Sequence, residues 1–290
     1  MNTNINVEFV VTKHLKLYGN ALNAGDGVQF KKKMIRFIDD FYSSDMDILV
    51  DPKKMMNSLN PKGLTPLEEK AIITFLPGDF KFLSKLCNGE KIERWEGIRP
   101  IFKGKVDGEK IIIARSGVGA PASVMLLEEM FAFGVRKVLF FGYCGGIALG
   151  INSGDFLLPE EAVREEGTSY HYQPKGIPAK GDKEFIDILE KIIKQEGHPY
   201  HKGIVWTTDA IYRETMRKVR RFREEGILGV EMETSALFAS AAFRGIKIAG
   251  LLVVSDIFTK RIWKPAFFSS AFRNASKLGL KILVEAIPFI

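Results

Sequence analysis

The sequence predicts an α/β fold whose mostly parallel or mixed sheet is covered by helices on both faces. From about residue 70 onward, short apolar segments of strand length alternate with segments whose apolar residues recur at helical spacing. The 290 residues fit one large domain, with or without an extension. The composition, 46% hydrophobic and 27% charged, is ordinary for a globular protein, so a substantial core is expected.

The beginning of the chain reads differently from the rest. We interpret residues 1–65 as an N-terminal extension and residues 66–290 as the main domain. Within the extension, residues 30–44 carry apolar side chains near helical spacing, which predicts an amphipathic helix. Residues 56–66 contain the breakers proline and glycine and are interpreted as a connector. No segment of the extension has a catalytic pattern.

The main domain is predicted as an alternation of strands and helices. Strands are expected at residues 71–76, 110–116, 137–141, 155–159, 203–209 and 248–254. Helices are expected at residues 123–133, 182–197, 234–244 and 269–286, together with a basic helix after residue 209. Strands separated by helices in this way are typical of a sheet that is buried on both faces.

Composition also limits the class of partner. No apolar run reaches the roughly 20 residues that span a membrane, and the start lacks a secretory signal pattern. Cys87 and Cys144 show neither zinc spacing nor a disulfide framework, so a cytoplasmic protein with reduced thiols is expected. The net charge of +7 is densest at residues 212–225, either a nucleic-acid patch or a solvated helix face. The absence of interleaved aromatic residues favours the solvated face, so we expect no nucleic-acid or membrane partner.

Two acidic strings are the most specific signals in the chain. GVEMETSALF, residues 229–238, carries Glu231 and Glu233 where an apolar run turns into an Ala-rich helix. The predicted strand 248–254 ends in Ser255 and Asp256. Buried carboxylates are costly unless they bind something, and ligands of open α/β sheets bind at the carboxyl ends of strands. The two strings therefore indicate a site for a polyhydroxylated ligand with an acid nearby.

A ribose fits the first string. One carboxylate accepts hydrogen bonds from two adjacent hydroxyl groups, and Met232 offers a soft wall to a sugar ring. The alternative interpretation is an acid favoured by the dipole at a helix N-terminus. That alternative explains Glu233 but leaves Asp256 unexplained.

Three further motifs are weaker when taken alone. GVGAPAS, residues 117–123, fits a phosphate-binding helix start or a tight structural turn. GYCGG, residues 142–146, lets a flat ligand approach the backbone, with Cys144 as a small wall residue rather than a nucleophile. His171 lies between two tyrosines, either as a structural residue or as part of a base-binding loop.

Seven motifs in one order resemble the nucleoside phosphorylase superfamily over about residues 61–290. They are LPGD, SGVGAPAS, GYCGG, GDFLLPEEAVREEGTSYHY, TTDAIYRE, GVEMETSALF and VVSD. The resemblance implies a single α/β domain with a central mixed, partly barrel-like sheet flanked by helices. It also implies a homodimer, or a homohexamer built from dimers.

The resemblance assigns roles to matching positions. Glu233 matches the carboxylate that holds the ribose diol, Met232 lies against the sugar, and Glu231 is the other acid of that motif. Asp256 matches the acid that purine-cleaving members place near purine N7, and it is expected to donate a proton or a strong hydrogen bond there. The base is expected between one wall and an aromatic pair, and phosphate at a glycine loop; the matching residues are Cys144, Gly145, Ile211, Tyr212 and Gly78.

The sequence departs from the family pattern where phosphate would bind. Phe82 and Phe140 stand where family phosphorylases have arginines, and the histidine lent by a neighbouring subunit is replaced near Pro61. Thr215 stands where uracil-reading members have a glutamine. The basic residues that could supply phosphate charge instead are Lys81, Arg94, Arg99 and Arg213.

The resemblance implies cleavage of the N-glycosidic bond of a nucleoside by phosphorolysis, giving free base and ribose 1-phosphate. A purine base is favoured by Asp256, inorganic phosphate is the expected co-substrate, and neither a cofactor nor a metal is implied. Three alternatives remain at this point. They are a hydrolytic nucleosidase similar to short AMP nucleosidases, a uridine phosphorylase, and a non-catalytic nucleoside-binding protein.

Overall fold

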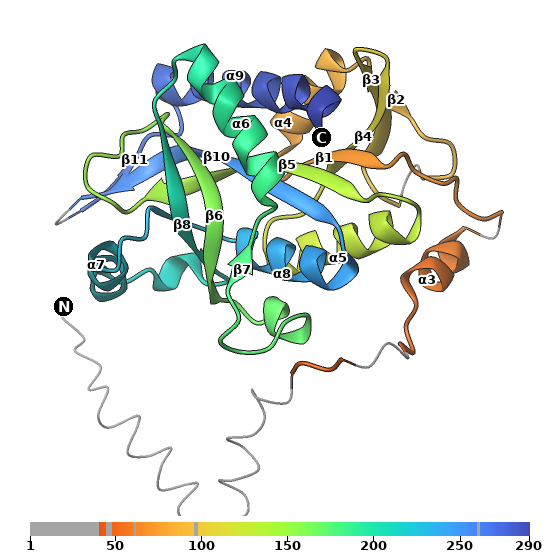
Figure 1. The fold of residues 1–290 in the computed structure, drawn as a ribbon, viewed down its shortest axis with the longest axis horizontal. Helices are drawn as coiled ribbons and strands as arrows, with labels where there is room; N and C mark the ends of the chain where they lie inside the picture. Colours follow the sequence, from red (N-terminus) through yellow and green to blue (C-terminus); the bar gives the residue numbers. More distant parts are fainter. Residues whose placement is uncertain (1–40, 45–47, 61, 96–97, 260–261) are drawn as a thin grey trace, which may run out of the picture. The chain divides into compact units, whose positions relative to one another are not determined.

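The computed structural model describes residues 41–44, 48–60, 62–95, 98–259 and 262–290. The chain divides into two compact units, residues 1–44 and 45–290, and the second contains every helix and strand given below (Figure 1). The amphipathic helix predicted at residues 30–44 falls mostly outside the described residues, and the boundary at residue 65 stays a prediction. None of the described helices has the length and apolarity needed to cross a membrane.

The second unit alternates strands and helices as predicted. Its strands are β1 (Lys70–Thr74), β2 (Glu90–Lys91), β3 (Ile101–Val106), β4 (Glu109–Arg115), β5 (Lys137–Gly146), β6 (Phe156–Glu165), β7 (Ala179–Lys180), β8 (Tyr200–Thr208), β9 (Gly229–Glu231), β10 (Lys247–Phe258) and β11 (Trp263–Pro265). Its helices are α3 (Pro52–Leu59), α4 (Pro77–Leu86), α5 (Ala120–Ala132), α6 (Lys183–Glu196), α7 (Met216–Glu224), α8 (Thr234–Arg244) and α9 (Ser270–Ala286), with short 3-10 turns η1 (Thr168–His171), η2 (Ile211–Arg213) and η3 (Ile287–Phe289).

The described strands form one mixed sheet that closes on itself in part. The order is β11-β10-β6-β8-β9-β5-β1-β4-β3-β2, with β7 beside β6 and an additional pairing between β10 and β5. The strands β5, β10, β6, β8 and β9 therefore form a closed hydrogen-bonded ring. This ring is the predicted partly barrel-like sheet, so the expectation for the fold class is confirmed.

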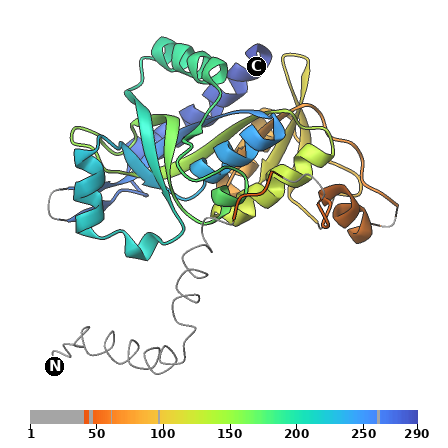
Figure 2. The same ribbon diagram turned by 60° about the horizontal axis from the view of Figure 1, so that its bottom comes forward.

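Helices cover both faces of the sheet because the buried strand residues alternate between two cores. Ile73 and Phe140 belong to the core that α5 and α8 cover, whereas Ile72 and Leu139 belong to the core under α4, α6 and α9. Figure 1 shows α5 and α8 side by side below the sheet, and the view in Figure 2 brings them to the front; the two helices make extensive contacts. Apolar side chains on both faces of one strand are typical of a doubly covered sheet.

Capping residues explain where the helices begin and end. The side chain of Asp182 accepts a hydrogen bond from Phe185 N at the start of α6, and that helix ends at Gly197, whose φ is 64°. Helix α8 spans residues 234–244 as predicted and ends at Gly245 with φ 67°. Glycine tolerates this left-handed conformation without a steric penalty.

Several boundaries differ from the prediction. Strand β10 continues to Phe258 because it keeps pairing with β5 and β11, so Asp256 lies within the strand beside an irregularity that begins at Val254. The β3–β4 hairpin was not predicted; Asp107 and Gly108 form its turn with φ of 48° and 88°. Part of the predicted connector, through Leu59, belongs to α3.

Candidate active site

A cavity of about 590 Å³ opens at the carboxyl ends of β1, β5, β9 and β10. This is the edge at which ligands of α/β sheets bind, and the volume suits a small molecule. It is lined by Phe75, Leu76, Asp79, Val118, Phe141, Gly142, Tyr143, Cys144, Gly145, Ile211, Tyr212, Glu214, Val230, Glu231, Met232, Glu233, Ser255, Asp256, Phe258, Trp263 and Phe267. Most of the residues predicted for the site therefore share one cavity.

Glu231 is held by the protein through both carboxyl oxygens. Its Oε1 accepts a hydrogen bond from the hydroxyl of Thr207, and its Oε2 accepts from the backbone N–H groups of Glu233 and Thr234, both at 2.7 Å. These N–H groups belong to the start of α8, where the helix leaves donors without intrahelical partners. Glu231 therefore positions its neighbour Glu233, in addition to lining the cavity.

Glu233 links two of the predicted motifs. Its Oε1 accepts a 2.6 Å hydrogen bond from the backbone of Gly119, in the loop that begins α5. Gly119 has a φ of 101°, which favours glycine. The motif at residues 117–123 thus directs an amide at a carboxylate of the protein. Burial, together with the charge of Glu231, raises the pKa of Glu233 to about 8.

Asp256 accepts a hydrogen bond on each carboxyl oxygen. The hydroxyl of Ser255 donates to Oδ1 and the indole of Trp263 donates to Oδ2, both at 2.7 Å. Trp263 reaches this position because β11 pairs antiparallel with the end of β10. The two donors fix the orientation of a buried acid that lines the cavity.

A flat wall lies beside Asp256. A Cβ atom at Gly145 would lie 2.7 Å from the ring of Phe258 and 2.8 Å from Asp256 Oδ2, so only glycine fits. Cys144 is buried, and burial raises the pKa of its thiol well above the ordinary value. A protonated, buried thiol agrees with its interpretation as a wall residue rather than a nucleophile.

The segment that follows β8 contributes Ile211, Tyr212 and Glu214 to the cavity. The first two belong to η2 and are exposed, with Tyr212 96% exposed at the rim. Burial and the negative charges of Asp256 and Glu165 raise the pKa of Glu214 to about 7. The positive charge of Lys218, which lies 2.5 Å from Glu165, acts on the pKa of Glu214 in the opposite direction.

At another part of the cavity, Tyr143 donates a 2.8 Å hydrogen bond to Asp79 Oδ1. Asp79 lies in the first turn of α4, immediately after Gly78 of the predicted phosphate loop. Burial raises the pKa of Asp79 to about 6, although the hydrogen bond from Tyr143 acts in the opposite direction. Gly78 itself is exposed and does not line the cavity.

No lysine, arginine or histidine lines the cavity among the residues that the structure describes. Arg99 is bound to Glu129 through two hydrogen bonds of 2.7 and 2.6 Å, and Arg94 donates to the carbonyl of Lys62. Lys81 and Arg213 are exposed and do not line the cavity. The cavity therefore presents five carboxyl groups without a cation, and the described residues contain no cluster suited to a metal ion.

The two phenylalanines at the expected arginine positions belong to the protein interior. Phe140 is fully buried, and a Cβ atom at Gly250 would lie 2.1 Å from its ring. Its ring also packs edge-on against Phe75 and Phe238, with centroids 6.4 and 6.0 Å apart. Phe82 packs partly buried against the opposite core. Neither side chain lines the cavity.

Three positions singled out in the sequence lie elsewhere. His171 lines a separate hollow of about 320 Å³ whose walls come from α3, α5 and η1, so the structure does not bring it to the cavity. Thr215 caps α7 by accepting a hydrogen bond from Lys218 N. Pro61 lies outside the described residues.

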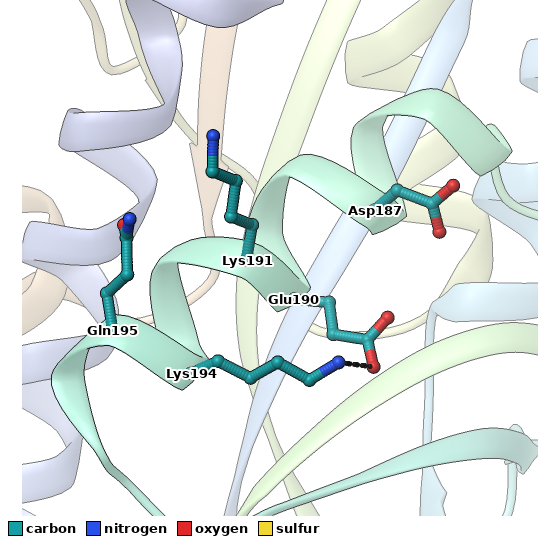
Figure 3. A pocket seen from close by; sticks show the side chains of 5 residues that line it. All are labelled: Asp187, Glu190, Lys191, Lys194 and Gln195. Atoms are coloured by element: carbon teal, nitrogen blue, oxygen red, sulfur yellow. Dashed lines mark ion pairs between the residues drawn. The ribbon is translucent and has the colours of Figure 1, made fainter.

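A further hollow, of about 400 Å³, lies on the surface of α6 (Figure 3). Its five residues, Asp187, Glu190, Lys191, Lys194 and Gln195, all come from one helix. Glu190 is paired with Lys194 at 3.0 Å and with Lys202 at 2.6 Å. Two lysines therefore offset the charge of Glu190.

Sequence reasoning missed several residues of the cavity. Asp79, Tyr143 and Glu214 stand inside quoted motifs, but no motif rule assigns them a role. Trp263 stands two residues after Arg261 and has no motif around it. Only the β10–β11 pairing, which cannot be read from residues 259–262, brings its indole to Asp256.

Known proteins are similar to this chain in sequence and in fold. The model of the phosphorylase superfamily matches residues 69–288. Guanosine phosphorylase of Halorubrum lacusprofundi is 28% identical over 188 residues, covering 65% of this chain and 78% of that protein. Uridine phosphorylase of Escherichia coli is 29% identical over 216 residues, covering 70% and 81%.

Two further proteins are similar to this chain over a larger share of their own length. A DeoD-type purine nucleoside phosphorylase of Bacillus cytotoxicus is 31% identical over 220 residues, covering 72% of this chain and 92% of that protein. The crystal structure of uridine phosphorylase from Vibrio fischeri superposes with a TM-score of 0.68 at 24% identity, covering 77% and 93%. The chain therefore belongs to the phosphorylase superfamily and is an enzyme of the nucleoside phosphorylase type.

Proposed function

We propose that the cavity binds a nucleoside and that the enzyme cleaves its N-glycosidic bond by phosphorolysis, with a purine base favoured. The observation that carries the proposal is the placement of Glu233 and Asp256 in one cavity, with Asp256 beside the wall at Gly145. Relatives named guanosine, uridine and purine nucleoside phosphorylases support the reaction type. Inorganic phosphate is the proposed co-substrate, and the proposed assembly is a homodimer or homohexamer.

Each acid has a separate task in this mechanism. Cleavage at a ribose passes through a transition state with oxocarbenium character, so the sugar must be held while charge builds at the anomeric carbon. Glu233 holds the ribose hydroxyls, with Met232 against the sugar, and Glu231 keeps Glu233 in place through the start of α8. Asp256 interacts with the departing base as electron density moves onto it.

Asp256 supports the purine preference. By the resemblance, purine-cleaving members have an acid at this position, whereas uridine phosphorylases of the enterobacterial kind do not. The residue is fixed by Ser255 and Trp263 next to the wall, where a base would lie. Thr215, in place of a uracil-reading glutamine, supports the same preference.

The test is a product assay on wild type and on Asp256→Asn. Guanosine, inosine, adenosine and uridine are incubated with and without phosphate, and the sugar product is identified. We expect ribose 1-phosphate from purine nucleosides in the presence of phosphate. Asp256→Asn should lower this cleavage by about 100-fold or more, the scale of general acid catalysis. An absence of cleavage in every reaction would refute the proposed function, and unchanged turnover of the variant would refute the role of Asp256.

Hydrolysis is the second candidate function. It is favoured by one observation, namely that the described lining of the cavity contains no cation for a phosphate dianion. The same assay separates the two candidates, because hydrolysis yields free ribose, or ribose 5-phosphate from a nucleotide.

A further inference from the structure

Glu214 lines the cavity with a carboxyl group that is not bound to another side chain. It stands between the 3-10 turn η2 and helix α7. Its backbone N–H donates to the carbonyl of Ile211 at 3.3 Å, and the next residue, Thr215, caps α7. Its carboxyl group has no hydrogen bond or ion pair with a described residue. The backbone is therefore fixed, while the carboxyl group is available to a bound molecule.

Asp256 differs from Glu214 in this respect. Its two carboxyl oxygens accept 2.7 Å hydrogen bonds from the hydroxyl of Ser255 and the indole of Trp263. An ionised carboxylate only accepts hydrogen bonds, whereas a protonated carboxyl group also has a proton to donate. Donors on both oxygens therefore match the ionised form of Asp256. In that form Asp256 can stabilise a positive charge on a bound base but has no proton to give to it.

The surroundings of Glu214 favour its protonated form. Burial has the largest effect, and the negative charges of Asp256 on β10 and Glu165 on β6 act in the same direction, so the pKa of Glu214 is raised to about 7. Lys218 on α7 opposes this, but its ammonium group lies 2.5 Å from Glu165. Three other carboxyl groups line the cavity, and no described lysine, arginine or histidine does. Two carboxyl groups whose environments favour opposite protonation states can divide the roles of acid and anion.

We propose that Glu214 is the general acid that gives a proton to the departing base, while Asp256 stays ionised and stabilises the positive charge that this proton brings. The inference rests on the proposed cleavage of a nucleoside in this cavity, and it places the source of the proton on the segment after β8. Glu214 and Asp256 are both catalytic residues because both contact the base. Ser255 and Trp263 are positioning residues that act through Asp256.

The step balances with the co-substrate already proposed. A phosphate oxygen bonds to the anomeric carbon of the ribose while the glycosidic C–N bond breaks and its electron pair moves onto the base. The O–H bond of the Glu214 carboxyl group breaks, and its proton goes to a ring nitrogen of the base. The products are free base and ribose 1-phosphate, and Glu214 is left as a carboxylate. It regains a proton from solvent, because its side chain is only half-buried.

The experiment compares the pH dependence of kcat/KM for base release by the full chain, from mildly acidic to mildly alkaline pH. Saturating phosphate and the nucleoside that wild type cleaves fastest are used throughout. Glu214→Gln and Asp256→Asn each remove one of the two acids. Both are expected to be slower than wild type, so the pH profile, and not the rate alone, identifies the proton donor. Glu224→Gln is the matched control, because Glu224 is exposed at the end of α7 and does not line the cavity.

We expect wild type and Glu224→Gln to lose kcat/KM as pH rises through about 7, where Glu214 releases its proton. Glu214→Gln should lower kcat by about 100-fold or more and lose this alkaline limb, because glutamine has no carboxyl proton at any pH. Asp256→Asn should keep the limb and move it to lower pH, because the negative charge that favours protonated Glu214 has been removed.

The opposite pattern would overturn the inference. An alkaline limb that Glu214→Gln keeps and Asp256→Asn loses would assign the proton to Asp256 and leave the proposed function standing. If wild type cleaves no nucleoside, the inference and the proposed function both fail.

A second variant guards against misfolding. Glu214→Asp retains an acid that is one methylene group shorter, so it should keep an alkaline limb and cleave faster than Glu214→Gln. Thermal unfolding of each variant shows whether it is folded. A folded Glu214→Asp without the limb, or a folded Glu214→Gln as active as wild type, would overturn the assignment of the acid.

Discussion

Gly145 sets the distance between the cavity wall and the acid that faces the base. The ring of Phe258 and the carboxyl of Asp256 both approach the space that a side chain would occupy, at 2.7 and 2.8 Å. Neither neighbour is free to move, because Phe258 is buried in a core cluster and Asp256 is held by Trp263. The wall and the acid therefore form one unit.

Gly145→Ala should lower kcat/KM for the favoured nucleoside by about 100-fold, because a displacement of about 1 Å in an active site has effects of this size. Gly167→Ala is the matched control, since a Cβ atom at Gly167 meets nothing within 4 Å. Steady-state kinetics of both variants check the prediction. Equal losses in the two variants would show that the contact with Asp256 is unimportant.

The residues of the site differ in how far the sequence could predict them. Glu233 and Asp256 were predicted because a carboxylate near the end of a buried strand is costly unless it binds a ligand. Met232 was predicted because it stands next to Glu233. The structure places all three in one cavity. Asp79 and Glu214 were not predicted as site residues, because exposed acids are common in turns and at helix starts. Only the fold shows that these two are partly buried around a common space.

At the scale of elements, the contact between β8 and the start of α8 carries the sugar side of the site. Thr207 of β8 is fully buried; its hydroxyl donates to Glu231 and accepts a 2.9 Å hydrogen bond from Ser235 N. Ser235 in turn donates to Glu166 at the end of β6. The helix start that places Glu233 is therefore anchored to two strands of the closed ring.

Thr207→Val should break this anchor while keeping the shape of the side chain. It leaves Glu231 Oε1 and Ser235 N without their partner, and an unsatisfied buried group costs about 1–3 kcal/mol. We expect a lower free energy of unfolding in urea and a higher KM for the nucleoside. Thr208→Val is the control, because among the described residues the Thr208 hydroxyl accepts one hydrogen bond, from Ala210 N, and none involves the start of α8. A stable variant with unchanged KM would contradict the anchoring role.

Element boundaries were predictable where a local signal exists. Helix α8 matches the expectation at both ends, with Gly245 as its stop signal. Strand β10 was predicted four residues short of Phe258, because polar Ser255 and Asp256 look like the end of a buried strand. Pairing with β5 and β11 keeps those residues in the sheet, and such long-range pairing has no local signature.

At the scale of the whole molecule, the acids of the cavity make stability depend on pH. The pKa values of Asp79, Glu214 and Glu233 are raised to about 6, 7 and 8, mainly by burial, from ordinary values of 3.8, 4.5 and 4.5. Between the ordinary and the raised values, the folded state retains protons that the unfolded state has released. Stability is therefore lost as pH rises through this window.

We expect a lower free energy of unfolding at pH 8.5 than at pH 5.5, measured by urea denaturation. Glu190, whose pKa is lowered to about 2 by hydrogen bonds from Lys202, Lys194 and Tyr200, loses its contribution only below this range. Glu233→Gln should reduce the dependence on pH, because the variant has no proton to release at that position. An equal or higher stability of wild type at pH 8.5 would contradict the burial of these acids.

The packing of Phe140 has a consequence for the engineering of this enzyme. Position 140 now belongs to an aromatic cluster with Phe75 and Phe238, and Gly250 leaves room for the ring. An arginine introduced there alone would place a charge in an apolar core without a partner. Phe140→Arg alone is therefore expected to destabilise the core, and an arginine-based phosphate site at this position would require changes at Phe75, Phe238 and Gly250 as well.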